Sequence, residues 1–299
     1  MTIKNTDSIQ TWTDSKVTVT EEYFKTTDGV RLRLIDFIPS DEDDRLPIII
    51  FVAGWISMIS AWEEVLRVLT PRFRTLYIET REKKSALIDW KQSPEFSIER
   101  MVRDIREILE DRVPADRPFC LAGSSLGSTV ILEYLARNLR HPVLTVAIAP
   151  NAEFGLPRWF YPVARFLPPG AYGAVRGLVK WYLRTYRVDS VREREQAKKY
   201  EASLDEADPR RLKASAMTMK GYSLWSKLEK ITDPVIIVAA KTDTLHGVEA
   251  MKHMTDRIEG ARLEVMESNR ETHSERAGRF ILEHIEQWVE SADRQQGQP

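Results

Sequence analysis

Short hydrophobic runs alternate with amphipathic segments along most of the chain. The runs that predict β-strands are 17–24, 30–37, 47–52, 74–78, 118–122, 143–149, 234–240 and 262–266. Apolar residues three or four positions apart predict helices near 61–69, 98–109, 126–139, 247–258 and 277–289. The first two strands are separated by Asp28-Gly29, which favours a hairpin. This alternation predicts an α/β fold with a mostly parallel sheet covered by helices on both faces.

The pattern changes after residue 150. Four prolines (Pro157, Pro162, Pro168 and Pro169) interrupt an aromatic-rich stretch, and no clear strand follows until Pro234. We therefore expect a helical cap inserted into the α/β core. The predicted units are the first part of the core (1–150), the cap (151–232), the second part of the core (233–292) and a polar, disordered tail (293–299).

Composition and charge narrow the function classes. The 299 residues are 42% hydrophobic and 30% charged, with a net charge of −1, which is typical of a globular protein without a global field for nucleic acid. The lone Cys120 lies in an apolar strand, where a thiol usually packs as a small hydrophobe. Residues 1–16 lack the apolar core of a signal peptide, so we expect a cytoplasmic protein. No metal-ligand spacing is present, and no cofactor is implied.

A basic segment lies within the predicted cap. Between Phe154 and Val188 there is no acidic residue, and the basic ones are Arg158, Arg165, Arg176, Lys180, Arg184 and Arg187. Apolar and basic positions there separate onto opposite sides of a helix. One interpretation is a lid with apolar walls for an acyl chain and a basic face toward an anionic headgroup or membrane surface. The other is an ordinary cap helix with solvated arginines.

The sequence Gly123-Ser124-Ser125-Leu126-Gly127 fits the pattern G-x-S-x-G between a strand and a helix. In this arrangement the central serine lies on a strained turn that raises its hydroxyl above the sheet edge. The flanking glycines are needed because a Cβ would collide with neighbouring elements. The helix that begins near Leu126 directs unpaired N–H groups at the same place. Ser125 is therefore the candidate nucleophile.

Two further residues follow predicted strands. Asp243 comes after the strand 234–240, and His273 comes after the strand 262–266. Catalytic groups gather beyond the carboxyl ends of parallel strands, and the order Ser, Asp, His is a known arrangement of the catalytic triad. The alternatives are a small residue in a tight turn for Ser125, a turn or capping residue for Asp243 and a solvated loop residue for His273. His246, three residues after Asp243, is a weaker candidate for a catalytic residue.

From residue 17 to residue 289 the chain resembles α/β-hydrolase-fold proteins with a helical cap, on the evidence of the Gly123–Gly127 turn and the positions of Asp243 and His273. The resemblance implies an eight-stranded sheet, with Ser125 as nucleophile, His273 as general base and acid, and Asp243 as the group that orients His273. It also implies an oxyanion hole made by the backbone N–H groups of Trp55 and Leu126.

Three segments depart from the family pattern. Many members carry His-Gly where this chain has Ala53-Gly54, and many carry Gly where Thr272 precedes His273. The loop 79–84 reads Glu-Thr-Arg-Glu-Lys-Lys in place of Asp-x-Arg-Gly-x-Gly.

The resulting hypothesis is a serine hydrolase that cleaves carboxylic esters, with apolar acyl groups preferred. A thioesterase or a carbon–carbon bond hydrolase would use the same triad. A noncatalytic ligand-binding member of the fold is an alternative from a different class. The expected partner is a small apolar or acyl ester substrate, with peripheral contact to anionic lipid through the basic cap as a further possibility. The sequence does not indicate an oligomeric state.

Overall fold

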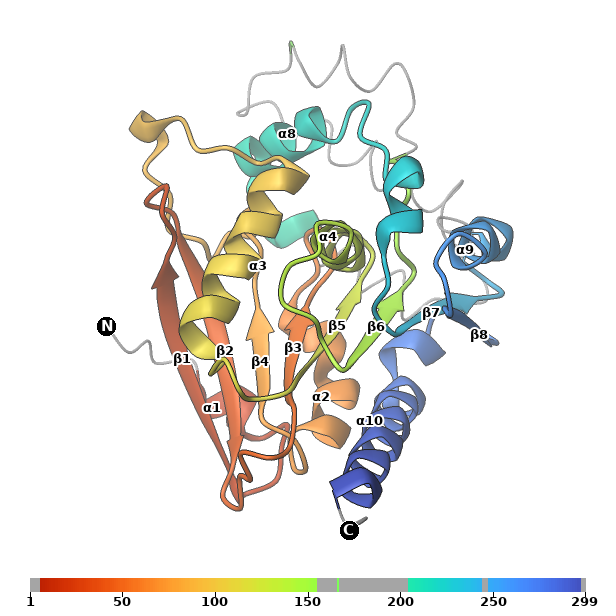
Figure 1. The fold of residues 1–299 in the computed structure, drawn as a ribbon. Coiled ribbons are helices and arrows are strands. Elements are labelled where there is room, and N and C mark those ends of the chain that lie inside the picture. The colour runs from red at the N-terminus through yellow and green to blue at the C-terminus, as the bar shows by residue number, and fades with distance from the viewer. Residues whose placement is uncertain (1–5, 155–165, 167–203, 244–246, 297–299) are drawn as a thin grey trace.

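One sheet of eight strands organises the computed structural model, which describes residues 6–154, 166, 204–243 and 247–296 (Figure 1). The strands are β1 (Val17–Lys25), β2 (Arg31–Pro39), β3 (Ile48–Val52), β4 (Thr75–Ile78), β5 (Phe119–Ser124), β6 (Leu144–Ile148), β7 (Val235–Ala240) and β8 (Arg262–Met266). Their order is β1-β2-β4-β3-β5-β6-β7-β8. The pairs β1–β2 and β2–β4 are antiparallel, and the other five pairs are parallel. The predicted, mostly parallel eight-stranded sheet is confirmed.

Helices cover both faces of this sheet. The described helices are α1 (Thr6–Gln10), α2 (Glu63–Leu69), α3 (Ile98–Arg112), α4 (Leu126–Leu135), α8 (Pro209–Thr218), α9 (Val248–Thr255) and α10 (Glu275–Gln296). Short 3₁₀ helices are η1 (Ile59–Trp62), η2 (Trp90–Gln92), η4 (Trp225–Lys230) and η5 (Glu271–His273). Figure 1 shows α3 and α4 in front of the sheet and α2 and α10 behind it. Among the described residues, no helix combines the length and apolar character needed to cross a membrane.

Strand β3 shows why the central runs are apolar throughout. Its residues alternate between two hydrophobic clusters: Ile48, Ile50 and Val52 pack with α3 and α4, whereas Ile49 and Phe51 pack with α2 and α10. All five side chains are buried. A strand covered on both faces needs apolar residues at every position, which explains why the central strands read as continuous apolar runs.

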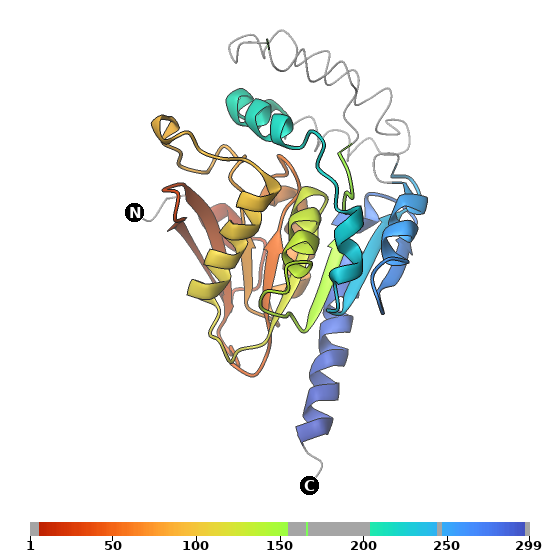
Figure 2. The same ribbon diagram turned by 45° about the horizontal axis from the view of Figure 1, so that its top comes forward.

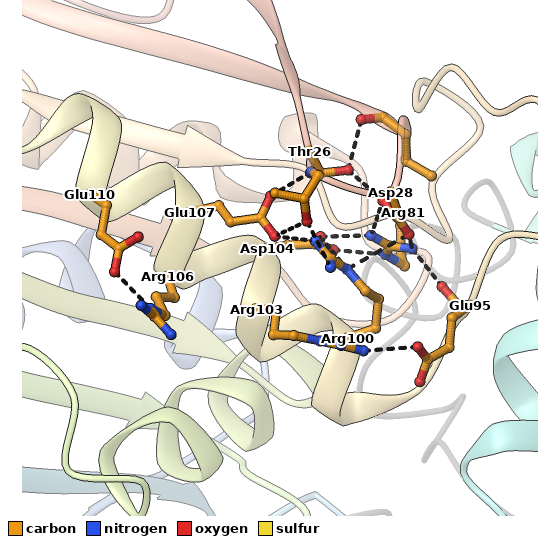
Figure 3. Close-up of polar contacts among 12 residues, drawn as sticks. Thr26, Asp28, Arg81, Glu95, Arg100, Arg103, Asp104, Arg106, Glu107 and Glu110 are labelled. Carbon is orange, nitrogen blue, oxygen red and sulfur yellow. Dashed lines mark hydrogen bonds and ion pairs between the residues drawn. The ribbon is translucent and has the colours of Figure 1, made fainter.

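The tight turn between β1 and β2 is joined to α3 by a buried ion cluster, which consists of Asp28, Arg81, Arg100, Asp104 and Glu107 (Figure 3). The predicted hairpin is present, and Gly29 adopts the left-handed backbone with φ of 84°. Beside it, the fully buried Arg81 donates from Nε and Nη2 to both oxygens of Asp104, at 2.7 and 2.6 Å. It also donates from Nη1 to Asp28, at 2.8 Å.

Replacing Arg81 by methionine is expected to lower the free energy of unfolding by about 3 kcal/mol, because the buried Asp104 would keep only Arg100 as a cationic partner and Asp28 would lose its ion pair with Arg81. Burial opposes the charge of Asp28, yet hydrogen bonds from Arg81 and Thr26 outweigh it and lower its pKa to about 2. That carboxylate therefore stabilises the fold above its ordinary pKa, and the contribution is lost as the pH falls toward 2. Urea unfolding of wild type and Arg81→Met at pH 7 measures the loss of stability. Urea unfolding of wild type at pH 7 and pH 3 measures the pH dependence.

The matched control for this prediction is Arg106→Met on α3, the helix that carries Asp104. Arg106 pairs with Glu110 at 2.6 Å across the exposed side of α3 (Figure 3). Exposed pairs of this kind contribute little, so the urea midpoint should barely change. Equal losses in both variants would contradict a special role for the buried cluster.

The structure corrects one expectation drawn from the sequence. The sequence predicts a disordered tail from residue 293, and this boundary is too early. Helix α10 continues to Gln296 and extends past the sheet (Figure 2). A helix already anchored by packing gains one hydrogen bond per added residue, and the exposed pair Arg294–Glu290 lies in its last turns. The loop 79–84, whose sequence is polar throughout, is buried over residues 79–83.

Other expectations concern regions that the structure describes only in part. The predicted basic segment 154–188 lies outside the described residues, apart from Phe154 and Phe166. Of the predicted cap (151–232), residues 151–154, 166 and 204–232 are described, and the last range contains α8 and η4. Figures 1 and 2 show α8 beyond the end of the sheet at which β3 and β4 finish. The division into core and cap stays a prediction.

Cys120 lies inside β5 and is 2% exposed. Burial raises the pKa of its thiol far above the ordinary value, so the reactive thiolate does not form near neutral pH. This agrees with the prediction that Cys120 packs as a small hydrophobe.

Candidate active site

Ser125 occupies the turn that joins β5 to α4. Every residue of β5 is buried, α4 begins at Leu126, and between them Ser125 is only partly buried. Its φ of 47° and ψ of −114° lie in a region that residues other than glycine rarely adopt. The N–H of Ser125 donates to the carbonyl of Ile148 at 2.8 Å, which ties the turn to β6. The strained turn expected at Ser125 is present.

The two glycines of the motif allow α4 to approach the sheet. A Cβ on Gly123 would lie 2.7 Å from Ile131 Cδ1 and 2.8 Å from the carbonyl oxygen of Val52. A Cβ on Gly127 would lie only 2.1 Å from the same oxygen. The predicted reason for glycine on both sides of the serine is therefore the actual one.

Asn151, which the sequence reasoning did not single out, contacts the serine hydroxyl. Its Nδ2 donates to Ser125 Oγ at 3.2 Å. Thr129 of α4 fixes the Asn151 backbone, because its hydroxyl donates to the Asn151 carbonyl at 3.0 Å and accepts from the Asn151 N–H at 2.9 Å. Asn151 comes three residues after β6, so the rule that functional groups follow strand ends could have found it.

The contacts of Nδ1 favour one tautomer of His273. Its Nδ1 lies 3.1 Å from the carbonyl oxygen of Asn269 and 3.0 Å from Thr272 Oγ1, which itself donates to that carbonyl. A carbonyl oxygen only accepts, so Nδ1 carries a proton and Nε2 of the neutral ring keeps a lone pair. The ring stacks on Trp62, with centroids 4.3 Å apart, and the residue is 8% exposed. This burial excludes the alternative of a solvated loop histidine.

Asp243 follows β7, as predicted, and is 8% exposed. The neighbouring Thr242 Oγ1 accepts a hydrogen bond from the N–H of Asn269 at 3.0 Å, which ties the loop after β7 to the loop that carries His273. Helix α9 begins after Gly247, so Asp243 does not cap it. His246 lies outside the described residues. The joining of Ser125, Asp243 and His273 into a hydrogen-bonded triad stays a prediction.

The loop after β3 lies close to the serine turn. A Cβ on Gly54 would lie 3.2 Å from the carbonyl oxygen of Ser124 and 3.3 Å from Ser125 Cβ. The N–H of Leu126 has no partner within its own helix, because it belongs to the first helical residue. These contacts bring the predicted oxyanion loop beside the candidate nucleophile, while the role of the Trp55 and Leu126 N–H groups stays a prediction.

Several bonds restrain this loop, which we call the oxyanion loop (residues 53–58). The N–H of Ser57 donates to the Gly54 carbonyl at 3.1 Å, and Ile56 between them has a φ of 51°. Such a value is strained for a β-branched residue. Trp55 Nε1 donates to Ser215 Oγ of α8 at 3.0 Å. Lys83 of the buried polar loop donates from Nζ to the Gly54 carbonyl at 2.6 Å.

The comparisons with known proteins agree with this architecture. A sequence profile described as "Alpha/beta hydrolase family" matches residues 49–284. Comparison with curated protein sequences finds no match.

Solved structures with a similar fold include proteins of several activities. An esterase from Exiguobacterium antarcticum is 16% identical, with a TM-score of 0.71 over 88% of this chain and 98% of that one. An enol-lactonase from Burkholderia xenovorans LB400 is 18% identical, with a TM-score of 0.71 over 89% and 98%. A bromoperoxidase from Bacillus anthracis is 12% identical, with a TM-score of 0.72 over 89% and 100%. At these identities the likeness shows a shared fold.

Proposed function

Because the chain belongs to the alpha/beta hydrolase family, we propose that it is a serine hydrolase that cleaves carboxylic esters through an acyl-enzyme. The observation that carries this proposal is the strained backbone of Ser125 at the first turn of α4, with φ of 47°. A structural serine in a tight turn would not need that strain, since glycine adopts the same backbone without cost. The strain is explained if this backbone is needed to place the Ser125 hydroxyl where a substrate can reach it.

In the proposed reaction the Ser125 hydroxyl attacks the ester carbonyl while Nε2 of His273 takes its proton. The negative charge on the carbonyl oxygen is stabilised by the N–H groups of Trp55 and Leu126. The imidazolium of His273 then donates its proton to the departing alcohol, which leaves the acyl group on Ser125. Water, deprotonated by His273, releases the acid and restores the serine. Asp243 is proposed to stabilise the imidazolium.

Esters are favoured over the other bonds that this machinery can cleave. Two of the similar structures are described as an esterase and an enol-lactonase, and a lactone is a cyclic ester. A thioesterase, a carbon–carbon bond hydrolase and a noncatalytic binding protein are the alternatives. Preference for apolar acyl groups belongs to the same proposal and rests on the apolar cap sequence.

Fluorophosphonate labelling followed by intact-mass measurement tests the nucleophile. Wild type is expected to gain one adduct and Ser125→Ala none, because only an activated serine attacks the probe. Ser124→Ala is the matched control: its residue is the adjacent serine, 5% exposed, and this variant should label like wild type. Absence of an adduct on folded wild type, or an adduct that survives in Ser125→Ala, would contradict the proposal.

A substrate series then separates the alternatives. p-Nitrophenyl esters of two to twelve carbons, the matching thioesters and a dienoic ketone are compared by kcat/KM. Ester cleavage should dominate and increase with chain length, since each buried methylene contributes about 0.8 kcal/mol. A higher kcat/KM for the ketone or the thioesters would assign the corresponding alternative.

A further inference from the structure

The orientation of the Trp55 N–H is determined by the peptide group that it shares with the Gly54 carbonyl. This peptide bond is trans, so the carbonyl and the N–H point in opposite directions within one plane. A group that holds the carbonyl on one side therefore aims the N–H toward the other. In this protein, two donors reach the Gly54 carbonyl: the N–H of Ser57 at 3.1 Å, within the same loop, and the ammonium group of Lys83 at 2.6 Å, from a different loop.

Lys83 is suited to holding the Gly54 carbonyl because its side chain is buried and each of its N–H donors is engaged. The residue is 7% exposed. Its Nζ donates to the Gly54 carbonyl at 2.6 Å, to Thr80 Oγ1 at 3.1 Å and to Glu82 Oε1. An ammonium group has three N–H donors, so each of them has an acceptor. All three donors of Lys83 are therefore engaged.

The surroundings of Lys83 hold it in place. The side chain of Glu82 is completely buried, pairs with the ammonium group and accepts a second hydrogen bond from Thr80 Oγ1 at 2.8 Å. The backbone is also restrained, because the N–H of Lys83 donates to the Thr80 carbonyl at 3.0 Å. Arg211 of α8 donates from Nη1 to the Lys83 carbonyl.

We propose that Lys83 is a positioning residue of the oxyanion hole: its ammonium group holds the Gly54 carbonyl and so aims the Trp55 N–H at the oxygen that becomes negative in the reaction. This inference rests on the proposed function. It gives a role to the loop 79–84, whose sequence departs from the family pattern. A charge-assisted hydrogen bond to the carbonyl also polarises the peptide group, which makes the N–H a stronger donor.

The consequence is an effect on the transition state and not on substrate binding. The ester carbonyl gains its full negative charge only in the transition state, so a weakened oxyanion donor lowers kcat and leaves KM nearly unchanged. A lysine that merely stabilises the fold would instead change the unfolding midpoint with kcat preserved in the folded protein.

The experiment compares Lys83→Met with Lys84→Met, which removes an exposed neighbouring lysine paired with Glu206 at 3.3 Å. We expect kcat for p-nitrophenyl butyrate to fall roughly 10- to 100-fold in Lys83→Met, less than the 10²- to 10³-fold loss typical of deleting an oxyanion donor itself. KM should stay within about threefold, as expected for a group that acts only in the transition state. Lys84→Met should match wild type in both constants.

Lys83→Met leaves Glu82 buried without its cation, and the single variant could fail to fold for that reason. The double variant Glu82→Gln/Lys83→Met removes both charges together and is measured alongside. A folded double variant with the same loss of kcat supports the proposal. A folded double variant with wild-type kcat overturns it, as does a loss that appears in KM alone.

The backbone N–H resonance of Trp55 in a ¹⁵N-tryptophan spectrum provides a readout independent of activity. It should move in Lys83→Met and stay in place in Lys84→Met, and an unmoved resonance in both would overturn the positioning role. Wild type that neither hydrolyses esters nor labels would contradict the proposed serine hydrolase. In that case a Lys83-dependent Trp55 resonance would still establish the contact that aims the N–H.

Discussion

Replacing His273 by alanine is expected to lower kcat for ester hydrolysis by roughly 10⁴- to 10⁶-fold, because Ser125 would lose the base that takes its proton. The Asn269 carbonyl accepts the Nδ1–H of His273, so the lone pair of the neutral ring is on Nε2. Stacking on Trp62 limits rotation of the ring. Steady-state kinetics on p-nitrophenyl butyrate measure the loss.

His284→Ala is a closely matched control. Its Nδ1 lies 2.9 Å from the carbonyl oxygen of Phe280, also four residues earlier, and its ring lies 4.3 Å from the ring of Phe280. Each histidine thus has Nδ1 close to a carbonyl four residues earlier and its ring against an aromatic ring, but His284 lies on α10 and not in the loop after β8. A normal kcat in His273→Ala, or an equal loss in His284→Ala, would remove His273 from the proposed mechanism.

Replacing Gly127 by alanine is expected to destabilise the protein by about 5 kcal/mol or more, a value that only severe steric conflict or loss of a buried network produces. The new Cβ would lie 2.1 Å from the Val52 carbonyl oxygen and 2.7 Å from that of Ala53. Both belong to backbone that cannot move freely, because β3 pairs with β4 on one side and with β5 on the other. Chemical unfolding and the yield of soluble protein report the effect.

Gly247→Ala provides the comparison, since a Cβ there would meet no atom of the described residues within 4 Å. Gly247 precedes α9, where glycine and alanine differ by about 1 kcal/mol at most as capping residues. A Gly127→Ala protein as stable as Gly247→Ala would show that α4 can withdraw from β3.

The central strands and the serine turn could be predicted from the sequence because their causes are local. Continuous apolar runs such as 48–52 have no stable place except a strand covered on both faces. The pair of glycines around Ser125 identifies a close approach of backbone that no other residue permits. The hairpin at Asp28-Gly29 follows from the backbone freedom of Gly29 alone.

The residues that sequence reasoning missed depend on partners far along the chain. The loop 79–84 resembles any solvated loop until Asp28 and Asp104 are seen to neutralise Arg81 in the interior. Trp62 fits the apolar stripe of a helix, and nothing in its neighbours indicates that its ring supports His273. Long-range pairing of this kind is a property of the fold, so a local pattern does not contain it.

The buried Cys120 makes the protein convenient for spectroscopy. It is the one cysteine among the 299 residues, and burial both encloses its sulfur and raises the pKa of its thiol. A maleimide reagent at neutral pH therefore has no accessible native thiolate to modify. A cysteine introduced at an exposed position of α8 and another on α10 would carry a donor and an acceptor dye without background labelling, and energy transfer between the dyes would follow α8 during turnover.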